Sequence, residues 1–284
     1  MNDLTIRRWS GRLAGAVAAI ALIAGFTAAP ATAAPAPPTP VYIALGDSYA
    51  AGTGGGAYTP SAAGLPATCL QTAASYPAVR NATLNLGCFG ATTMNVIDVA
   101  TQFAPALATA TVVTVTVGGN DIDTGQVALA CTASASSPAC KAALFNSLVV
   151  KLRELPGKIK EMLKTVKSTA PNAKIVLTGY PRLFTVSAGL TAEQTQAARS
   201  MNSAADLLNA TIAFSALVNR VGYVSVTEKF SGHGIGSANP WIVAPTGLCT
   251  LAINCSPSPF DAFHPTATGY SGGYAAALAA VRVP

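Results

Sequence analysis

Five short runs of apolar and β-branched residues recur along the chain, and helical patterns separate most of them. The runs span residues 41–45, 83–86, 111–117, 174–179 and 223–227. Most of their positions are apolar on both faces, which is typical of strands buried on both sides of a sheet. Residues 145–168 have apolar side chains at helical spacing, and Thr191 to Gln194 form a capping-box pattern that opens another long helix. This alternation predicts an α/β fold with a parallel sheet between layers of helices.

Three of the predicted strands are followed directly by residues that suit a catalytic site. Ser48 follows the first strand in the string GDSY, Gly90 follows the second in CFGAT, and Asn120 follows the third in VGGND. Ligands of such sheets bind at the carboxyl ends of the strands, and in the order 2-1-3-4-5 the first strand lies between the second and the third. We therefore expect Ser48, Gly90 and Asn120 to converge.

The chemistry of these residues points to attack on an ester. A serine hydroxyl is a weak nucleophile until an imidazole takes its proton and a further group orients that imidazole. His264 and Asp261, in the string DAFHP, supply both groups for Ser48. Attack on the carbonyl creates an oxyanion, which preorganised donors stabilise. The candidate donors are the backbone N–H groups of Ser48 and Gly90, where glycine permits close approach, and the side-chain amide of Asn120.

In chain order, the GDS string, the Gly90 loop, the GND string and D-x-x-H resemble the four sequence blocks of the SGNH, or GDSL-type, hydrolases. The chain is most similar to the secreted actinobacterial esterase and lipase branch, which has three disulfides and a Phe-x-Gly-His segment, here residues 230–233. The resemblance implies a flavodoxin-like three-layer α/β/α sandwich with a five-stranded sheet in the order 2-1-3-4-5. It also implies a Ser48, His264 and Asp261 triad with Ser48, Gly90 and Asn120 as oxyanion donors. Some relatives orient the histidine with a backbone carbonyl in place of an acid.

The first residues have the pattern of an export signal. Three arginines precede an apolar segment at about residues 13–26, and Ala31 and Ala33 form an A-x-A arrangement. We interpret residues 1–33 as a signal peptide, 34–40 as a Pro/Ala-rich linker and 41–284 as one hydrolase domain. The pair Arg7-Arg8 leaves twin-arginine export as an alternative to ordinary secretion. No later segment is an uninterrupted apolar run of the roughly 20 residues that a spanning helix requires, so we expect a secreted protein without an integral membrane segment.

Six cysteines in an exported chain predict disulfides, although sequence alone leaves many pairings open. Their spacing favours sequential pairs, each closing a short loop: Cys69 with Cys88, Cys131 with Cys140, and Cys249 with Cys255. A zinc site is the competing interpretation, but the sequence has no C-x-x-C pair and only two histidines. We therefore expect no metal.

Charge and glycine patterns argue against two other kinds of partner. Removing residues 1–33, with three Arg and one Asp, lowers the formal charge from +6 to +4. The remaining basic residues gather at 141–174 on a predicted helical face without interleaved aromatic residues, so we expect no nucleic acid. Gly52, Gly54 and Ala57 imitate a dinucleotide fingerprint, but the next acid, Asp98, lies well beyond the roughly 20 residues at which a ribose ligand is expected. No organic cofactor is expected.

The prediction is a secreted, monomeric serine carboxylic-ester hydrolase that acts on acyl esters, lipids among them, through an acyl-enzyme. Two alternatives stay open: an exported, inactive carbohydrate or cell-wall binding module, and an acyltransferase or acetyl-carbohydrate esterase with the same fold. Residues 269–273 match a G-x-S-x-G elbow around Ser271, but no Asp or His follows that serine. Loops 52–56 and 229–260 are the predicted cleft walls. His233 is expected to cap a carbonyl or line the cleft.

Overall fold

The computed structural model describes residues 39–62, 64–187, 189–251, 255–256 and 258–283. Thr39–Pro284 form one compact unit. The predicted signal peptide, residues 1–33, and residues 34–38 of the predicted linker lie outside the described residues. Within the described ranges, no helix combines the length and the hydropathy that crossing a bilayer requires.

The strands of the described residues form one parallel sheet in the predicted order, β2-β1-β3-β4-β5. Their bounds are β1 (Tyr42–Gly46), β2 (Leu84–Gly87), β3 (Val112–Thr116), β4 (Lys174–Thr178) and β5 (Gly222–Val224). Each strand begins within two residues of its predicted start. β5 ends three residues before the predicted boundary, and the residues after Val224 turn away as a loop.

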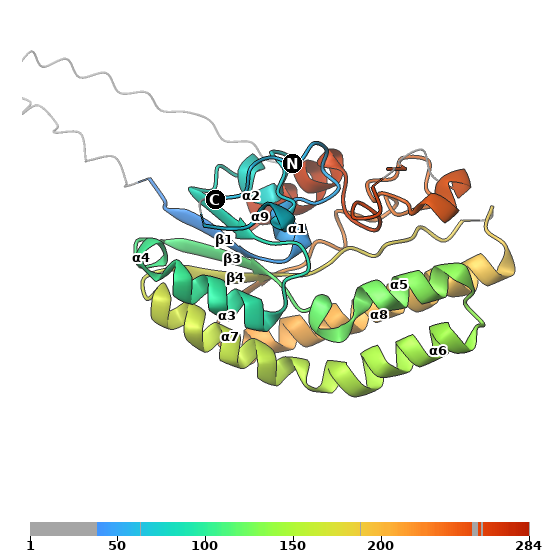
Figure 1. Cartoon of the computed structure of the whole chain (residues 1–284), viewed down its shortest axis with the longest axis horizontal. Helices are drawn as coiled ribbons and strands as arrows, with labels where there is room; N and C mark the ends of the chain where they lie inside the picture. The colour runs from blue at the N-terminus through green and yellow to red at the C-terminus, as the bar shows by residue number, and fades with distance from the viewer. Residues whose placement is uncertain (1–38, 63, 188, 252–254, 257, 284) are drawn as a thin grey trace, which may run out of the picture. The chain divides into compact units, whose positions relative to one another are not determined.

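Alternate residues of each strand enter separate apolar clusters on the two faces of the sheet. Ile43 and Leu45 pack on one face with α3 (Thr93–Gln102) and α7 (Leu155–Thr169). Tyr42 and Ala44 pack on the other face, where the covering elements are α2 (Tyr76–Val79), a π-helical turn (Gly269–Ala275) and α9 (Ala276–Ala280). Figure 1 shows α3 and α7 below the sheet and α2 and α9 above it. The result is the expected three-layer sandwich.

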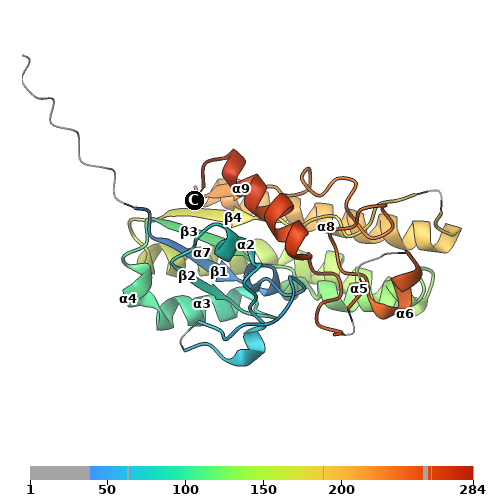
Figure 2. The ribbon, with the colours of Figure 1, turned by 90° about the horizontal axis from the view of Figure 1, so that it is seen from above.

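Helix α8 (Ala192–Val218) extends beyond the sheet and carries a second group of helices. It begins with the predicted capping box, in which Thr191 Oγ1 accepts from Gln194 N–H at 3.2 Å and the Gln194 side chain accepts from Thr191 N–H at 2.9 Å. Its C-terminal half packs on the sheet through Leu208 and Ile212. Its N-terminal half lies beside α5 (Thr124–Ala133), past the carboxyl ends of the strands, with α6 (Pro138–Phe145) next to α5 (Figure 2).

The predicted helix over residues 145–168 is divided in the structure. α6 ends at Phe145, and a π-helical turn (Asn146–Val150) and a 3₁₀ turn (Lys151–Arg153) precede α7. Pro156 lies in the first turn of α7, where its missing N–H leaves no helical bond unmade. The remaining short helices are α1 (Ser48–Ala51), α4 (Ala104–Leu107) and 3₁₀ turns at Ala67–Cys69, Asn120–Ile122 and Thr246–Leu251.

Candidate active site

The loops after β1, β2 and β3 leave the sheet at the same level. Parallel pairing places Gly46, the last residue of β1, opposite Gly87 of β2 and Thr116 of β3. The structure brings Ser48, Gly90 and Asn120, one from each following loop, to the lining of a single cavity at that edge.

Ser48 is the first residue of α1, directly after a tight turn out of β1. Asp47 caps this helix by accepting a hydrogen bond from the Tyr49 N–H at 2.9 Å. Gly46 has a φ of +137°, and a Cβ at this position would lie 2.2 Å from the carbonyl oxygen of Thr116. Glycine is therefore required both by the backbone conformation and by the close passage over β3. The turn leaves Ser48 only 6% exposed, in the lining of the cavity.

His264 brings a base to this serine from the far end of the chain. Its Nε2 lies 2.7 Å from Ser48 Oγ, and its ring packs beside Tyr49 and Phe89, with ring centroids 5.1 Å and 5.8 Å away. Burial lowers the pKa of His264 to about 4, against the smaller raising effects of nearby backbone carbonyls and the charge of Asp261. The imidazole is therefore neutral at neutral pH, and Nε2 can accept the Ser48 proton.

A strained turn holds the imidazole in this place. Phe263 has a φ of +65°, in the left-handed region that bulky side chains rarely adopt. The Tyr49 hydroxyl donates to the Phe263 carbonyl at 2.7 Å, and the Val243 N–H donates to the His264 carbonyl at 2.8 Å. The Phe263 N–H also donates to the Val243 carbonyl at 2.8 Å, so hydrogen bonds fix the backbone on both sides of the strained residue.

Asp261 lies close to His264 but does not make the expected orienting hydrogen bond. Its carboxylate accepts hydrogen bonds from the hydroxyls of Tyr58 and Ser256. His264 Nδ1 is buried and has no hydrogen-bond partner among the described residues. The carbonyls of residues 260–262 and the carboxylate of Asp261 both raise the pKa of His264, so both lie near enough to favour the protonated ring. The interaction of Asp261 with the imidazole is therefore one of charge in this structure.

Gly90 and Asn120 border the cavity on the side of β2 and β3. Gly90 has a φ of +77°, and no protein atom would lie within 4 Å of a Cβ there, so it is the backbone conformation that favours glycine at this position. Asn120 Nδ2 donates one hydrogen to the Ala91 carbonyl at 2.9 Å, and the amide has a second N–H to offer. Asp121 fastens this loop to α3 by accepting from the Thr93 N–H at 3.0 Å and hydroxyl at 2.6 Å.

The cavity has a volume of about 280 Å³, and residues of two helices form part of its lining. Met201, Ala204, Ala205 and Leu208 of α8 line it at the i, i+3, i+4 and i+7 positions of one helix face. Residues 127–129 of α5 line it from the other side. The walls are apolar, so the cavity suits a hydrocarbon chain that begins at a group bound beside Ser48.

The walls differ from those predicted. None of residues 52–56 lines the cavity, and the described part of 229–260 contributes Pro259 and Phe260. Helix α5 and the face of α8 from Met201 to Leu208 supply apolar lining that was not predicted, because these helices extend past the carboxyl edge of the sheet (Figure 1). Their side chains at the cavity have the same apolar spacing as core residues, so the sequence pattern did not distinguish a cavity wall from a core face.

Comparison with known proteins shows the family of this chain. Residues 44–271 match the model of the GDSL-like Lipase/Acylhydrolase family. The chain belongs to this family. It is therefore a hydrolase that acts on ester bonds.

Named relatives of this GDSL-like hydrolase come from Streptomyces. A lipase of Streptomyces rimosus is 31% identical over 259 residues, which cover 89% of this chain and 90% of the relative. The crystal structure of the extracellular lipase from Streptomyces rimosus has a TM-score of 0.73 at 28% identity, covering 84% of this chain and 98% of that one. Phospholipase A1 from Streptomyces albidoflavus NA297 has a TM-score of 0.72 at 31% identity, with the same coverage.

Two of the three disulfides predicted for this GDSL-like hydrolase are confirmed. Cys69–Cys88 joins a 3₁₀ turn to the loop that carries Gly90, and Cys131–Cys140 joins α5 to α6. Cys255 is also disulfide-bonded, whereas the side chain of its predicted partner, Cys249, lies outside the described residues.

His233 lies outside the cavity lining of the GDSL-like site. Its Nδ1 lies 2.8 Å from the carbonyl oxygen of Asn239, and its ring stacks on Trp241 with centroids 3.6 Å apart. The expectation that His233 caps a carbonyl is confirmed, and the alternative that it lines the cleft is wrong.

Sequence reasoning missed Tyr180, which belongs to the same edge of the sheet. This residue follows β4, and its buried hydroxyl donates to Asp47 Oδ2 at 2.5 Å. Burial raises the pKa of Asp47 to about 7, and the hydrogen bonds from Tyr180 and from the Tyr49 N–H oppose that rise. Applying the carboxyl-edge rule to the fourth strand, as to the first three, would have drawn attention to Tyr180.

Proposed function

We propose that the chain is an exported carboxylic-ester hydrolase in which Ser48 forms an acyl-enzyme and His264 moves the protons. The observation that carries this proposal is the 2.7 Å contact between Ser48 Oγ and His264 Nε2. A neutral imidazole with Nε2 as acceptor is the protonation state that a general base requires. The lowered pKa of His264 supports that state.

The reaction follows from this geometry. Ser48 Oγ attacks the ester carbonyl carbon while its proton passes to His264 Nε2, and the carbonyl electrons move to the oxygen. The resulting oxyanion accepts hydrogen bonds from the N–H groups of Ser48 and Gly90 and the free N–H of Asn120. When the tetrahedral intermediate collapses, the alkoxide leaves with the proton from His264. Water then repeats these steps on the acyl-enzyme and releases the acid.

Asp261 supports the imidazolium through its charge. The carboxylate is held by Tyr58 and Ser256, and with the neighbouring carbonyls it raises the pKa of His264. A negative charge near a ring that becomes positive during attack lowers the free energy of the transition state. Asp261 thus contributes without a direct hydrogen bond to Nδ1.

The proposed substrates are esters whose acyl chain lies between α5 and α8. Apolar side chains line this space from Ser48 outward, and Leu129 and Phe260 border it while being 63% and 49% exposed. The relatives named lipase and phospholipase A1 support a lipid acyl ester. An acetyl-carbohydrate substrate would leave these apolar walls without a function.

Export is proposed on the pattern of residues 1–33 and on the disulfides. Cys69–Cys88 and Cys131–Cys140 are typical of an oxidising compartment. The name of the extracellular lipase from Streptomyces rimosus supports the same location.

Labelling with a fluorophosphonate tests whether Ser48 is activated, and it separates an enzyme from an inactive binding module. We expect the chain to be labelled and to hydrolyse p-nitrophenyl butyrate. Ser48→Ala should lose labelling and about 10⁵- to 10⁶-fold in kcat, while its circular dichroism and melting temperature stay unchanged. Ser271→Ala is the matched control, because Ser271 is an exposed serine in the π-helical turn and lies outside the cavity lining. Unchanged hydrolysis by Ser48→Ala would overturn the proposal.

A further inference from the structure

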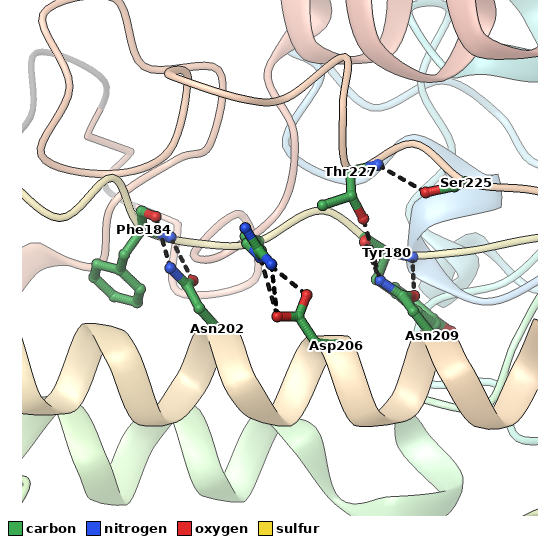
Figure 3. A network of polar contacts seen from close by, with 8 residues as sticks. Tyr180, Phe184, Asn202, Asp206, Asn209, Ser225 and Thr227 are labelled. Atoms are coloured by element: carbon green, nitrogen blue, oxygen red, sulfur yellow. Dashed lines mark hydrogen bonds and ion pairs between the residues drawn. The ribbon is translucent and has the colours of Figure 1, made fainter.

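The loop after β4 is fastened to α8 by a ladder of polar side chains. Asn209 Oδ1 accepts from the Tyr180 N–H at 2.7 Å, and its Nδ2 donates to the Tyr180 carbonyl at 2.8 Å. Asn202 makes the same pair of bonds with Phe184, at 3.1 Å and 2.8 Å. Figure 3 shows these pairs beside Asp206, which binds the Arg182 guanidinium between them.

This ladder fixes the backbone of Tyr180 beside the catalytic loops. Asn209 is 8% exposed, so its two bonds to Tyr180 are shielded from competition with water. The side chain of Tyr180 extends from this anchor towards the carboxyl ends of β1 and β3, where its ring meets Tyr49 edge to face with centroids 5.1 Å apart. Tyr180 therefore has a fixed backbone and a packed ring.

The Tyr180 hydroxyl joins two of the catalytic loops. It donates to Asp47 Oδ2 at 2.5 Å and accepts from the Gly119 N–H at 3.1 Å. Asp47 directly precedes Ser48 and caps its helix, and Gly119 directly precedes Asn120. The Tyr180 hydroxyl thus hydrogen-bonds the Asp47 carboxylate, on the loop of the nucleophile, and the Gly119 N–H, on the loop of the amide donor.

We propose that Tyr180 is a positioning residue, whose hydroxyl holds Ser48 and Asn120 in the relative arrangement that the transition state requires. This inference rests on the proposed roles of Ser48 and Asn120. A displacement of about 1 Å in a reacting group can cost about a hundredfold in rate. Without the hydroxyl, the Gly119 N–H and the Asp47 carboxylate each lose a buried partner, so the two loops are free to separate.

Tyr180→Phe tests the proposal because it removes the oxygen and keeps the ring. We expect kcat for p-nitrophenyl butyrate to fall about 10- to 100-fold. KM should change less than about twofold, since the apolar walls that bind the acyl chain stay in place. The second-order rate constant for fluorophosphonate labelling should fall in parallel with kcat. The matched control is Tyr42→Phe, which loses a buried hydroxyl bonded to Thr114 Oγ1 at 2.9 Å, away from the catalytic loops.

The outcomes separate positioning from general packing. A fall in kcat confined to Tyr180→Phe supports the proposal, whereas a kcat within twofold of the parent, or an equal fall in Tyr42→Phe, overturns it. If Tyr180→Phe does not fold, Asn209→Asp decides. This variant keeps an acceptor for the Tyr180 N–H and loses the donor to its carbonyl. A lower kcat at unchanged KM then supports the role of Tyr180, and an unchanged kcat overturns it.

A double-mutant cycle tests whether Tyr180 acts through the amide donor. In an Asn120→Ala background, the factor by which Tyr180→Phe lowers kcat should be at least about threefold smaller than in the parent enzyme. Part of what the hydroxyl positions, the Asn120 amide, is already missing there. Strict additivity would overturn the link between the two loops. The Ser48→Ala variant distinguishes failure of the proposed function from failure of the Tyr180 proposal. Activity in Ser48→Ala overturns the proposed function. An inactive Ser48→Ala with a fully active Tyr180→Phe overturns only the role of Tyr180.

Discussion

Replacing Ala205 by Phe is expected to shorten the acyl chain that the enzyme accepts. Ala205 is a half-buried residue of α8 whose side chain lines the cavity, between Met201 and Leu208 on the same helix face. A benzyl group at this position projects into a space of about 280 Å³ and takes the place of part of the substrate. Chemistry at Ser48 and His264 is left in place, so the variant separates acyl binding from bond cleavage.

The magnitude follows from the apolar surface that the chain would no longer bury. Each buried methylene contributes about 0.8 kcal/mol, or about fourfold in an equilibrium or in kcat/KM. If the ring excludes about four methylenes, a long-chain ester loses about 3 kcal/mol, which is about 200-fold in kcat/KM. An acetate or butyrate ester, whose chain ends near Ser48, should change less than about threefold.

The assay is kcat/KM for p-nitrophenyl acetate, butyrate, octanoate and palmitate. Ala210→Phe is the matched control, because Ala210 is exposed on α8 and does not line the cavity. We expect the ratio of octanoate to butyrate activity to collapse in Ala205→Phe and to stay constant in the control. A folded Ala205→Phe enzyme with an unchanged ratio would show that the acyl chain does not lie along α8.

Two further predictions concern His264. Asp261→Asn should lower kcat by about tenfold or less, because the carboxylate makes no hydrogen bond to His264 Nδ1. A loss of kcat near the ten-thousandfold expected for an orienting acid would show that Asp261 hydrogen-bonds the ring during the reaction. The acid limb of kcat/KM should have its midpoint at about 4, since the base must be neutral and burial lowers the pKa of His264 to that value. Activity should thus persist at pH 5, and a midpoint at the ordinary histidine value of about 6.5 would contradict the burial argument. An inflection of the kcat/KM profile near pH 7 that disappears in Asp47→Asn would instead report the titration of Asp47.

The strands and the meeting of the first three loops could be predicted from local pattern. The runs around Ile43 and Val113 are apolar on both faces, and parallel pairing carries their carboxyl ends to one edge whatever the helices do. The Ser48 loop could be recognised because the GDS string and the distant D-x-x-H pattern occur together. These features depend on residues close in sequence or on a topological rule.

Other parts of the site depend on contacts that no pattern records. Tyr58 and Ser256 donate to the Asp261 carboxylate, which makes no hydrogen bond to His264 Nδ1. Tyr58 is 203 residues away from Asp261 in sequence, so no local pattern indicates this contact. The wall residues of α5 and α8 are apolar like any core residues, so the space between them appears only when the path of the helices is known. The break between α6 and α7 likewise follows from two irregular turns that helical spacing did not predict.

Because α5 and the first half of α8 extend beyond the sheet, two separate groups of secondary-structure elements border the cavity. Ser48, Gly90 and Asn120 lie on loops at the strand ends, whereas part of the apolar cavity wall lies on helices that extend beyond the sheet (Figure 2). On the proposed function, substitutions on those helices change which acyl esters are accepted and leave the groups that break the bond in place.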